Sequence, residues 1–581
     1  MIVGGHAWSR FVAVVRCQST KTGLIPRIIR VCVRGKMQAP KNRGYVGAVE
    51  SAMEYLSDIM LDSSLLHDSS FIDGRCVEPI DSLPLEHHAI QMPSRGDQGR
   101  EGRTGTFLVM DPSTRTDEEA VLVELVDGGE MAAHYAVDVA ARMFEQWRAV
   151  SVRNRASLLR KWSELIRNHA GDLARIICAE TGKTVYDAYA EVQYAKSYVE
   201  WFAEEALRIQ GDYSCDPEAR VERVAVGVVG LMTPWNFPAA MVTRKVAAAL
   251  AAGCTAVLKP SERTTCTALA LADLAVRAGI APGAFNVVVA KDPALVSRVL
   301  STRKEVAKLS FTGSTAVGKM IIRQSALHVQ RLSLELGGNA PLLIFSSADI
   351  SETVSALVSN KVIRNCGQTC VSANRILVHD LLYDRFLAKL VQRIGELEPH
   401  NFWDNPGEDP CSPNPDASRF FGPLIHQEAV EKIELHIADA LHHGAQLVCG
   451  GKRIPKIGLN FYEPTVVVGG QPCMKAFGEE TFGPLFFIIR FANELDAIRL
   501  ANDTVSGLAG YVFSQDSGQC SRVAQALDVG MVGINTTAIS DCRMPFGGIK
   551  QSGYGREGSK YGLDEYLYLK YVRGSLSASS R

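Results

Sequence analysis

The chain has 581 residues, which is too long for one ordinary hydrophobic core and predicts two or three domains. Its hydrophobic content of 46% and charged content of 22% are typical of soluble globular proteins, and its net charge of −1 excludes a general attraction to nucleic acid or anionic membranes. It has no apolar run of the ~20 residues that a membrane helix needs, and its 14 cysteines are too scattered for a disulfide framework, which favours a reducing compartment.

The first 49 residues have a different composition, with nine Lys or Arg and no acidic residue before Glu50. Acid-poor, Arg-rich N-termini are typical of organelle transit peptides. This predicts a mitochondrial protein, with the cytoplasm as the alternative. A disordered tail or a wrongly assigned gene start would have the same composition, so we treat residues 1–65 as a basic segment that is either disordered or a transit peptide.

Between residues 50 and 223 the sequence predicts a hairpin, an insertion and a helix. The hairpin spans Phe71 to Val77 around an Asp-Gly pair, and the polar, Gly-rich residues 93–106 predict a flexible insertion. From Ser151 to His169 apolar residues recur at helical spacing, so this helix should have one buried face.

From residue 224 strand-like and helix-like segments alternate. Strands are predicted at 224–232, 254–258, 285–289 and 307–311, and helices at 241–252, 264–278 and 294–300. This alternation predicts a doubly wound parallel sheet, a fold that binds ligands beyond the carboxyl ends of its strands.

Three loops at those strand ends predict a nucleotide site. They are Thr233 to Pro238, Lys259 to Glu262, and Thr312 to Gly318. Gly and hydroxyl residues at a helix N-terminus leave backbone N–H groups for phosphate, and Glu262 could accept hydrogen bonds from ribose. The chain has no Gly-x-Gly-x-x-Gly, and Ser314 could simply cap a helix. The occurrence of three such loops on successive strands favours the nucleotide site.

In the stretch Arg331 to Phe345, a strand-like run carries Glu335 and ends in Gly337 and Gly338, which allow a sharp turn, and a later loop ends in Cys370. A thiolate can add to a carbonyl carbon, and the thioester that follows needs a base to activate water. The alternative is that Glu335 pairs with an Arg and that Cys370 is a packed, inert thiol.

Seven motifs, in order along residues 130–573, resemble the aldehyde dehydrogenase superfamily. They are Pro234-Trp-Asn-Phe237, Lys259-Pro260, Phe311-Thr-Gly-Ser314, Glu335-Leu-Gly-Gly338, Gly367-Gln-Thr-Cys370, Glu480-Thr-Phe-Gly-Pro484 and Pro545-Phe-Gly-Gly548. Within the superfamily the chain is most similar to the succinate-semialdehyde dehydrogenases, on the segments Trp201 to Glu205, Met241 to Lys245 and Ser552 to Tyr561.

The resemblance implies an α/β fold with three parts. They are a doubly wound NAD-binding domain (66–211 and 227–337), a second α/β catalytic domain (338–550) and a small β element for oligomerisation (212–226 and 560–575). It also implies a homodimer or homotetramer, since the closing strand at Leu567 to Val572 pairs subunits in the family. The implied cofactor is NAD, with NADP as the alternative, and the implied pathway is GABA catabolism.

The resemblance further implies Cys370 as nucleophile and Glu335 as general base, with Asn236 and the backbone N–H of Cys370 as the oxyanion hole. Glu262 favours NAD, because a carboxylate would repel a ribose phosphate. The implied dinucleotide contacts are Trp235, Lys259, Ser261, Glu262, Gly313, Ser314, Gly318, Glu480 and Phe482.

The carboxylate of a semialdehyde would be held at positions Arg244, Arg364 and Ser540, because guanidinium groups bind carboxylates with paired donors. Either Arg could instead make an ordinary ion pair. The stretch Asn360 to Arg364 looks one residue longer than in the family, which could displace Arg364 or bulge the end of a helix. Cys366 is unusual in the family and reads as an inert packed thiol.

No metal site is predicted, because Cys366 and Cys370 lack a second Cys or His pair at ligand spacing. The pairs at 87–88 and 442–443 are adjacent histidines that read as surface residues. The segment Trp403 to Ser418 resembles a lengthened surface loop.

The sequence therefore predicts NAD(P)-dependent oxidation of succinate semialdehyde through a cysteine thiohemiacetal and thioester. Glutarate semialdehyde is an alternative substrate. A non-catalytic nucleotide-binding scaffold is a second hypothesis, prompted by the extra residue before Cys370. A coenzyme-A-acylating relative would use the same Cys, but the presence of Glu335 argues against it, since water needs a base and a thiolate does not.

Overall fold

The computed structural model describes residues 56–77, 105–116, 121–213, 218–409, 412, 414 and 416–574. The predicted transit or disordered segment lies outside the described residues up to position 55, as does most of the predicted insertion at 93–106. Within residues 56–65 the prediction was wrong: Leu56 and Leu65 are buried, and the backbone N–H of Leu61 donates to Oδ1 of Asp172 at 2.8 Å. Apolar side chains at these positions extend the core, so the fold begins earlier than the basic composition indicated.

An eight-stranded sheet has the order β2-β1-β9-β8-β7-β10-β11-β23. Neighbouring strands from β9 to β11 are parallel, which confirms the predicted parallel sheet, and β1, β2 and β23 add antiparallel edges. The strands are β1 (Phe71–Ile72), β2 (Arg75–Cys76), β7 (Val228–Met232), β8 (Thr255–Lys259), β9 (Phe285–Val287), β10 (Val306–Thr312), β11 (Arg331–Glu335) and β23 (Gly553–Tyr554).

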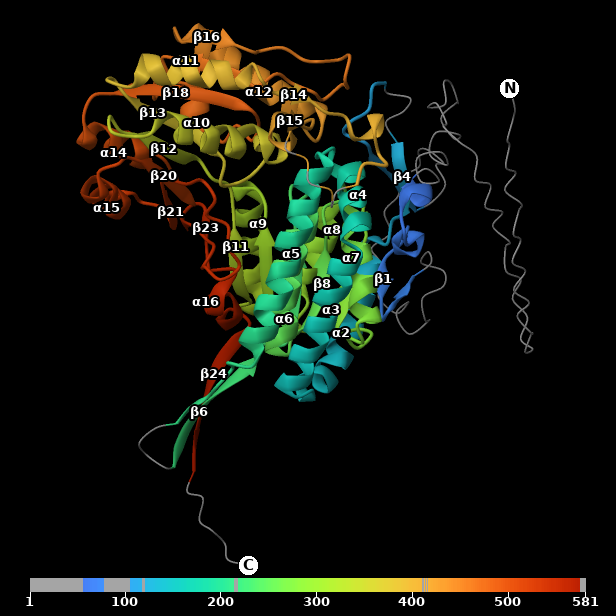
Figure 1. Cartoon of the computed structure of the whole chain (residues 1–581). Coiled ribbons are helices and arrows are strands. Elements are labelled where there is room, and N and C mark those ends of the chain that lie inside the picture. The colour runs from blue at the N-terminus through green and yellow to red at the C-terminus, as the bar shows by residue number, and fades with distance from the viewer. Residues whose placement is uncertain are drawn as a thin grey trace, which may run out of the picture. The chain divides into compact units, whose positions relative to one another are not determined.

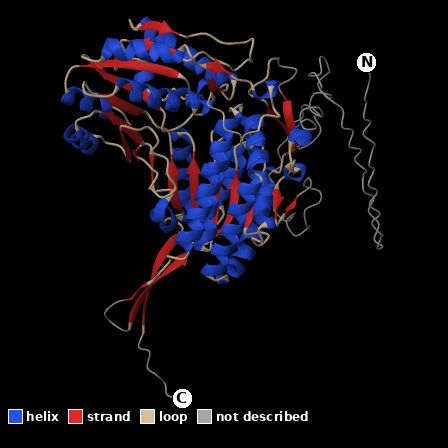
Figure 2. Cartoon of the chain, viewed as in Figure 1, coloured by secondary structure: helices blue, strands red, loops and turns tan. Residues whose placement is uncertain are grey.

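Figure 2 shows helices packed in front of the strands of this sheet. The side chains of β7 show that both faces of the sheet are covered. Val229 and Leu231 join the core formed with α3 to α7, whereas Val228 and Met232 join the core formed with α2, α8 and α9. Side chains alternate along a strand, so a strand that is apolar throughout needs a cover on each face. The helices are α2 (Gly129–Ala149), α3 (Val152–Asn168), α4 (Ala170–Thr181), α5 (Val185–Ala206), α6 (Pro238–Ala252), α7 (Thr265–Arg277), α8 (Pro293–Thr302) and α9 (Thr315–Ser325).

A second, seven-stranded sheet has the order β16-β17-β18-β13-β12-β20-β21, parallel except at β16. It has its own apolar core. Its strands are β12 (Ala340–Ile344), β13 (Ala373–His379), β16 (Gln446–Cys449), β17 (Thr465–Val468), β18 (Leu485–Phe491), β20 (Ala509–Phe513) and β21 (Met531–Ile534), and its helices are α10 (Ile350–Val358), α11 (Tyr383–Ile394), α12 (Gln427–His442), α13 (Lys475–Gly478), α14 (Glu494–Asn502) and α15 (Ser517–Ala526).

One predicted strand, 224–232, is divided in two. The run 224–232 is β6 (Ala219–Ala225) followed by β7, because Gly227 adopts φ +132°, a conformation that favours glycine. β6 pairs with β24 (Leu567–Arg573) and β5 (Asp212–Tyr213) in a separate antiparallel sheet (Figure 1). The stretch 331–345 is β11 and β12, which belong to different sheets and are joined through Gly337-Gly338.

The chain passes from the first sheet to the second between β11 and β12 and returns between β21 and β23. Ser552 ties the two passages together. Its hydroxyl donates to the carbonyl of Gly337 at 2.7 Å, and its carbonyl accepts from the N–H of Leu336 at 2.9 Å.

The remaining elements are short. The segment predicted as a long surface loop contacts α5 at Tyr186, whose hydroxyl donates to Oε1 of Glu408 at 2.6 Å and accepts from Nδ2 of Asn414 at 3.1 Å. These short elements are β3 (Thr106–Met110), β4 (Val121–Val126), β14 (Glu398–Pro399), β15 (Phe420–Phe421), β19 (Ser506–Gly507), β22 (Ile549–Lys550) and α16 (Ser559–Asp564).

Candidate active site

Glu335 ends β11 inside the protein. Its side chain is 2% exposed, and neither carboxyl oxygen has a hydrogen-bond partner among the described residues. Burial, followed by the charge of Glu557, raises its pKa well above the ordinary value. Glu335 is therefore a proton-binding group held in a dry environment.

The turn after β11 places the Cys370 loop directly against this strand end. A Cβ added at Gly338 would lie 2.1 Å from the carbonyl oxygen of Cys370, and one added at Gly547 would lie 2.9 Å from Oε1 of Glu335. Only glycine allows the backbone to approach so closely. The charge of Glu335 is among those that influence the Cys370 thiol. The structure thus brings the two predicted catalytic residues into one site.

The segment before Cys370 contains a bulge. Residues Ser359–Ile363 form a π-helix at the end of α10, with the N–H of Arg364 donating to the carbonyl of Ser359 at 3.0 Å. A π-turn accommodates one more residue than an α-turn and is often found at functional sites. Of the two predicted consequences of the extra residue, a displaced Arg364 or a bulge, the structure has the bulge.

The two cysteines of this loop differ in exposure. Cys366 is 1% exposed with φ +51°, and burial raises its pKa to about 12. Cys370 is half-buried, and burial, followed by the charge of Glu480, also raises its pKa to about 12, against the opposing charges of Arg244 and Arg364. The Cys370 thiol therefore needs a base in order to become a nucleophile at neutral pH.

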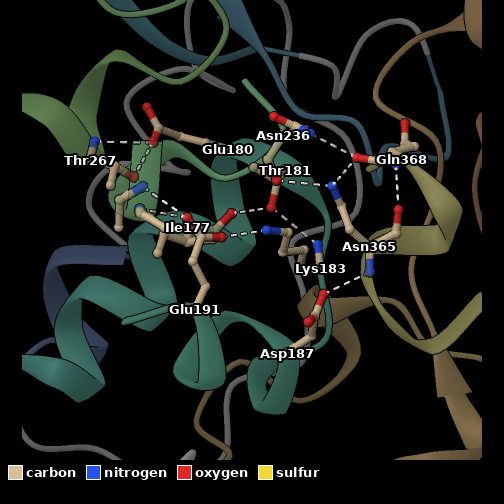
Figure 3. Close-up of polar contacts among 12 residues, drawn as sticks. Ile177, Glu180, Thr181, Lys183, Asp187, Glu191, Asn236, Thr267, Asn365 and Gln368 are labelled. Carbon is tan, nitrogen blue, oxygen red and sulfur yellow. Dashed lines mark hydrogen bonds and ion pairs between the residues drawn. The ribbon is translucent and has the colours of Figure 1, made fainter. Parts of the chain in front are cut away.

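Asn236 is hydrogen-bonded to the Cys370 loop (Figure 3). Its Nδ2 donates to the carbonyl of Gln368 at 3.0 Å, while Nδ2 of Asn365 donates to the carbonyl of Asn236 at 2.9 Å. Gln368 closes the network by donating from Nε2 to the carbonyl of Asn365 at 3.1 Å. Because an amide nitrogen carries two protons, Asn236 keeps one N–H for a further acceptor.

Helix α5 holds both segments in place (Figure 3). Oε1 of Glu191 accepts from the N–H of Ala239 at 2.8 Å, at the start of α6, and Glu191 pairs with the buried Lys183. Oδ2 of Asp187 accepts from the N–H of Asn365 at 2.9 Å. Two acidic residues one turn apart therefore fix the Asn236 and Cys370 loops relative to each other. Sequence reasoning did not identify them, since an acidic residue on an amphipathic helix is common.

Helix α6 presents two cations to one carboxylate. Nη1 of Arg244 lies 3.1 Å from Oε2 of Glu557, and Nζ of Lys245 lies 2.5 Å from Oε1. Burial alone would raise the pKa of Glu557, but these two charges bring it below the ordinary value. Lys245 and Glu557 were not predicted as site residues. The available signal was a pair of basic residues inside an otherwise apolar helix.

The residues predicted to bind the substrate carboxylate differ in burial and in whether they already form an ion pair. Arg364 is half-buried, lies over the Phe237 ring at 5.1 Å, and forms no ion pair within the described part of the chain. Arg244 is 2% exposed and is bound to Glu557 and to the Tyr194 hydroxyl, at 2.9 Å from its Nη2. Ser540 is half-buried. Arg364 is thus the guanidinium available to a ligand.

The predicted dinucleotide residues lie at the carboxyl ends of β7, β8 and β10. Nζ of Lys259 is 3.1 Å from Oε2 of Glu262, and Oγ of Ser261 accepts from the N–H of Arg263 at 3.2 Å. At the end of β10, Oγ1 of Thr312 is buried without a hydrogen-bond partner among the described residues. An ion pair and a hydroxyl without a partner, both at the edge where parallel sheets bind ligands, fit a dinucleotide.

At the start of α9, Ser314 caps the helix, its Oγ accepting from the N–H of Val317 at 3.4 Å. Gly313 precedes it, and Gly318 packs on Leu336, where a Cβ would lie 2.6 Å from Cδ2. The alternative prediction for Ser314, a helix cap, is confirmed, and capping leaves the other backbone N–H groups of the first turn for an anion.

The second sheet contributes Glu480 and Phe482 to the same region. Oε1 of Glu480 accepts from the N–H of Gly338 at 3.2 Å, and burial raises its pKa to about 7. The ring of Phe482, a residue with φ +58°, stands 5.5 Å from that of Trp235. These contacts bring the predicted cofactor residues of both sheets together.

Among the described residues, no group of three or more His, Cys, Asp or Glu side chains has the arrangement of a metal site. No helix in the described ranges combines the length and apolar composition needed to cross a bilayer.

The chain is similar to proteins of known sequence and structure. The family model described as aldehyde dehydrogenase family matches residues 100–572. The succinate-semialdehyde dehydrogenase GabD of Escherichia coli (strain K12), named for NADP(+), is 48% identical over 441 residues, which are 75% of this chain and 88% of that protein. The mitochondrial succinate-semialdehyde dehydrogenase of Homo sapiens is 46% identical over 518 residues, 88% of this chain and 89% of that protein. A crystal structure of succinate-semialdehyde dehydrogenase from Burkholderia pseudomallei matches with a TM-score of 0.80 at 43% identity, covering 89% of this chain and 100% of that one.

Proposed function

Because this chain belongs to the aldehyde dehydrogenase family, we propose that it oxidises succinate semialdehyde to succinate with NAD or NADP as hydride acceptor. Relatives named for this activity, at 48% and 46% identity, support the substrate. The observation that carries the proposal is the glycine turn that sets the Cys370 loop against the strand ending in Glu335.

In the proposed reaction the Cys370 sulfur forms a bond to the aldehyde carbon and the thiol gives up its proton. The free N–H of Asn236 and the backbone N–H of Cys370 stabilise the oxyanion of the thiohemiacetal. Glu335 acts as the base once it has released its own proton, and its raised pKa makes it a stronger base than an exposed carboxylate.

The dinucleotide is held by the residues at the carboxyl ends of β7, β8 and β10 together with Glu480 and Phe482. When bound, it supplies the acceptor for the hydride of the thiohemiacetal. Having passed the thiol proton of Cys370 to solvent, Glu335 takes a proton from water, and the resulting hydroxide attacks the thioester on Cys370. The C–S bond breaks, the departing thiolate receives the proton held by Glu335, and the carboxylic acid leaves.

We assign the distal carboxylate of the substrate to Arg364, with Ser540 beside it. Arg244 supports this assignment indirectly, since its charge is already neutralised by Glu557. Glutarate semialdehyde carries the same carboxylate on a chain one methylene longer, and the Arg364 contact alone does not reject it.

The test is an assay of the purified protein with succinate semialdehyde and either NAD or NADP. Arg364→Ala should raise KM for succinate semialdehyde about tenfold or more, because a charge-assisted contact to the distal carboxylate is lost, while KM for an uncharged aldehyde of equal length should stay constant. Equal effects on both aldehydes would show that Arg364 does not bind the distal carboxylate. Full NADH production by Cys370→Ala would refute the mechanism.

Cofactor choice is tested on the same assay. Glu262 pairs with Lys259, and a carboxylate there disfavours a ribose phosphate. We expect NAD to be preferred and Glu262→Gln to shift the ratio of kcat/KM values toward NADP. One relative is named for NADP(+), so a measured preference for NADP is the alternative result, and it would contradict the role given to Glu262.

We also propose a mitochondrial location, a homodimer or homotetramer and a place in GABA catabolism. The basic start of the sequence and the relative named as mitochondrial support the location. The exposed Tyr568, Leu569 and Tyr571 on β24 support subunit pairing, because an exposed apolar strand favours association. Light scattering of the purified protein and imaging of a tagged full-length chain test these proposals.

A further inference from the structure

A second group of reactive side chains lies away from Cys370, at the edge of the eight-stranded sheet. Cys76 ends β2, the edge strand, and its side chain is exposed. Its Sγ lies 3.3 Å from Nδ1 of His67, and Nε2 of His67 lies 3.4 Å from Oδ2 of Asp273 on α7. A nucleophile, an imidazole and an orienting carboxylate thus follow one another, and the carboxylate comes from a helix far from the other two in sequence.

The surroundings of His67 favour its charged form. The Asp273 carboxylate, followed by the contact with Cys76, raises the pKa of His67 to about 9, so the imidazole carries both protons at neutral pH. Asp273 is fixed in turn by Arg277, whose Nη2 lies 2.5 Å from Oδ2, and Arg277 also pairs with Asp62 at 2.5 Å. An imidazolium N–H directed at a sulfur stabilises the thiolate.

The side chains of Cys76, His67 and Asp273 differ in their exposure to solvent. The His67 and Asp273 side chains are only 17% and 15% exposed, so their ion pair is partly shielded from solvent, while the sulfur itself is open to small molecules. Such a combination of a shielded cation and an accessible thiol is typical of cysteines that react with electrophilic sulfur.

We propose that Cys76 is a site of reversible thiol–disulfide exchange with low-molecular-weight disulfides such as glutathione disulfide. The Cys76 thiolate forms a bond to one sulfur, the disulfide bond breaks, and its electron pair leaves with the second glutathione as a thiolate. His67 keeps its proton throughout. The step consumes no reactant other than the disulfide and is reversed by a thiol.

Cys473 provides a matched control within the same chain. Of the described cysteines, Cys76 and Cys473 are the exposed ones. The Cys473 sulfur lies 4.0 Å from Oε1 of Gln471, and no basic side chain is hydrogen-bonded to it within the described residues. The two thiols therefore share accessibility and differ in the neighbouring imidazolium.

The experiment measures, on the full-length protein at pH 6.5, the rate at which each cysteine is alkylated by iodoacetamide, resolved by peptide mass spectrometry. Cys76 should react about tenfold faster than Cys473, because an ordinary thiol is almost entirely protonated at this pH. Glutathione disulfide should add one glutathione to Cys76, which dithiothreitol removes. In His67→Gln, which keeps a polar side chain without the charge, the Cys76 rate should fall to that of Cys473, whose own rate should not change.

Equal rates for the two cysteines in the unsubstituted protein, or a Cys76 rate that His67→Gln leaves unaltered, would overturn the proposal. If His67→Gln does not fold, the ratio of the two alkylation rates in the unsubstituted protein decides. A Cys76 rate about tenfold above the Cys473 rate supports the proposal, and equal rates reject it.

Discussion

Two buried carboxylates near the Cys370 loop have opposite surroundings. Glu557 lies between Arg244 and Lys245, and these two charges outweigh burial and lower its pKa. Glu335 has no hydrogen-bond partner in the described part of the chain, and burial together with the charge of Glu557 raises its pKa. One carboxylate is thus a fixed charge and the other a group that binds and releases a proton, although the residue type is the same.

The largest expected effect comes from removing the unpaired carboxylate. Glu335→Gln should lower kcat about 10²- to 10⁴-fold, the usual contribution of a positioned base. Because Glu335 makes no hydrogen bond to lose, the free energy of unfolding at pH 5 should change by less than about 1 kcal/mol. Steady-state kinetics and urea denaturation on the same preparation measure both. A loss of stability comparable to the loss of activity would show that Glu335 is a structural residue.

Removing the paired carboxylate, Glu557, should instead cause a large loss of protein stability. Glu557→Leu leaves two buried cations uncompensated, which costs about 3–5 kcal/mol in the free energy of unfolding. Urea denaturation at neutral pH measures this cost. Asp541, an acidic residue with a side chain 33% exposed that pairs with Arg543, serves as the control, because Asp541→Asn should cost less than about 1 kcal/mol. Equal losses in the free energy of unfolding for Glu557→Leu and Asp541→Asn would contradict the interpretation of Glu557 as a fixed structural charge.

The two carboxylates should also have opposite effects on how stability depends on pH. Glu335 binds its proton more tightly in the folded state, so its contribution is complete below its ordinary pKa of 4.5 and is lost as pH rises toward the folded value. Glu557 has a lowered pKa, so its contribution is present above 4.5 and is lost as pH falls through the folded value. Thermal unfolding from pH 5 to pH 8 should therefore show Glu335→Gln gaining stability relative to the unsubstituted protein as pH rises. A difference that is constant with pH would contradict this.

A smaller effect is expected at α5. Asp187→Asn weakens the acceptor for the N–H of Asn365 and should lower kcat about tenfold, since it loosens the Cys370 loop without touching substrate. The control is Glu200→Gln on the same helix, at a side chain 51% exposed that pairs with Lys196. A positioning role predicts that kcat falls while KM for the dinucleotide stays constant. If both parameters change in proportion to a loss of stability, Asp187 is structural.

The parallel sheet of the first half was predictable, because strand and helix signals alternate there with clear glycine stops such as Gly253. The strand carrying Glu335 and the loop carrying Cys370 were also identified as local patterns. The partners of these residues were not. Lys245 and Glu557 are separated by 312 positions, and such a pairing is fixed by tertiary packing rather than by local periodicity.

One strand boundary failed for a related reason. The run at 224–232 looks continuous, because strands of two neighbouring sheets have the same apolar composition, and only the backbone conformation of Gly227 separates them. The turn at Gly337-Gly338 was predicted, because two adjacent glycines are a local signal. The bulge before Cys370 could be stated as one of two outcomes, since sequence length shows an extra residue but not how the backbone absorbs it.

Ser552 joins both passages of the chain between the two large sheets, beside Gly337. Its hydroxyl and its carbonyl fasten the two crossings at one residue, directly before the strand that pairs with the end of β11. The sulfur is carried by the second sheet and the carboxyl by the first, so the tether that holds the sheets together also fixes the spacing of the two reacting groups.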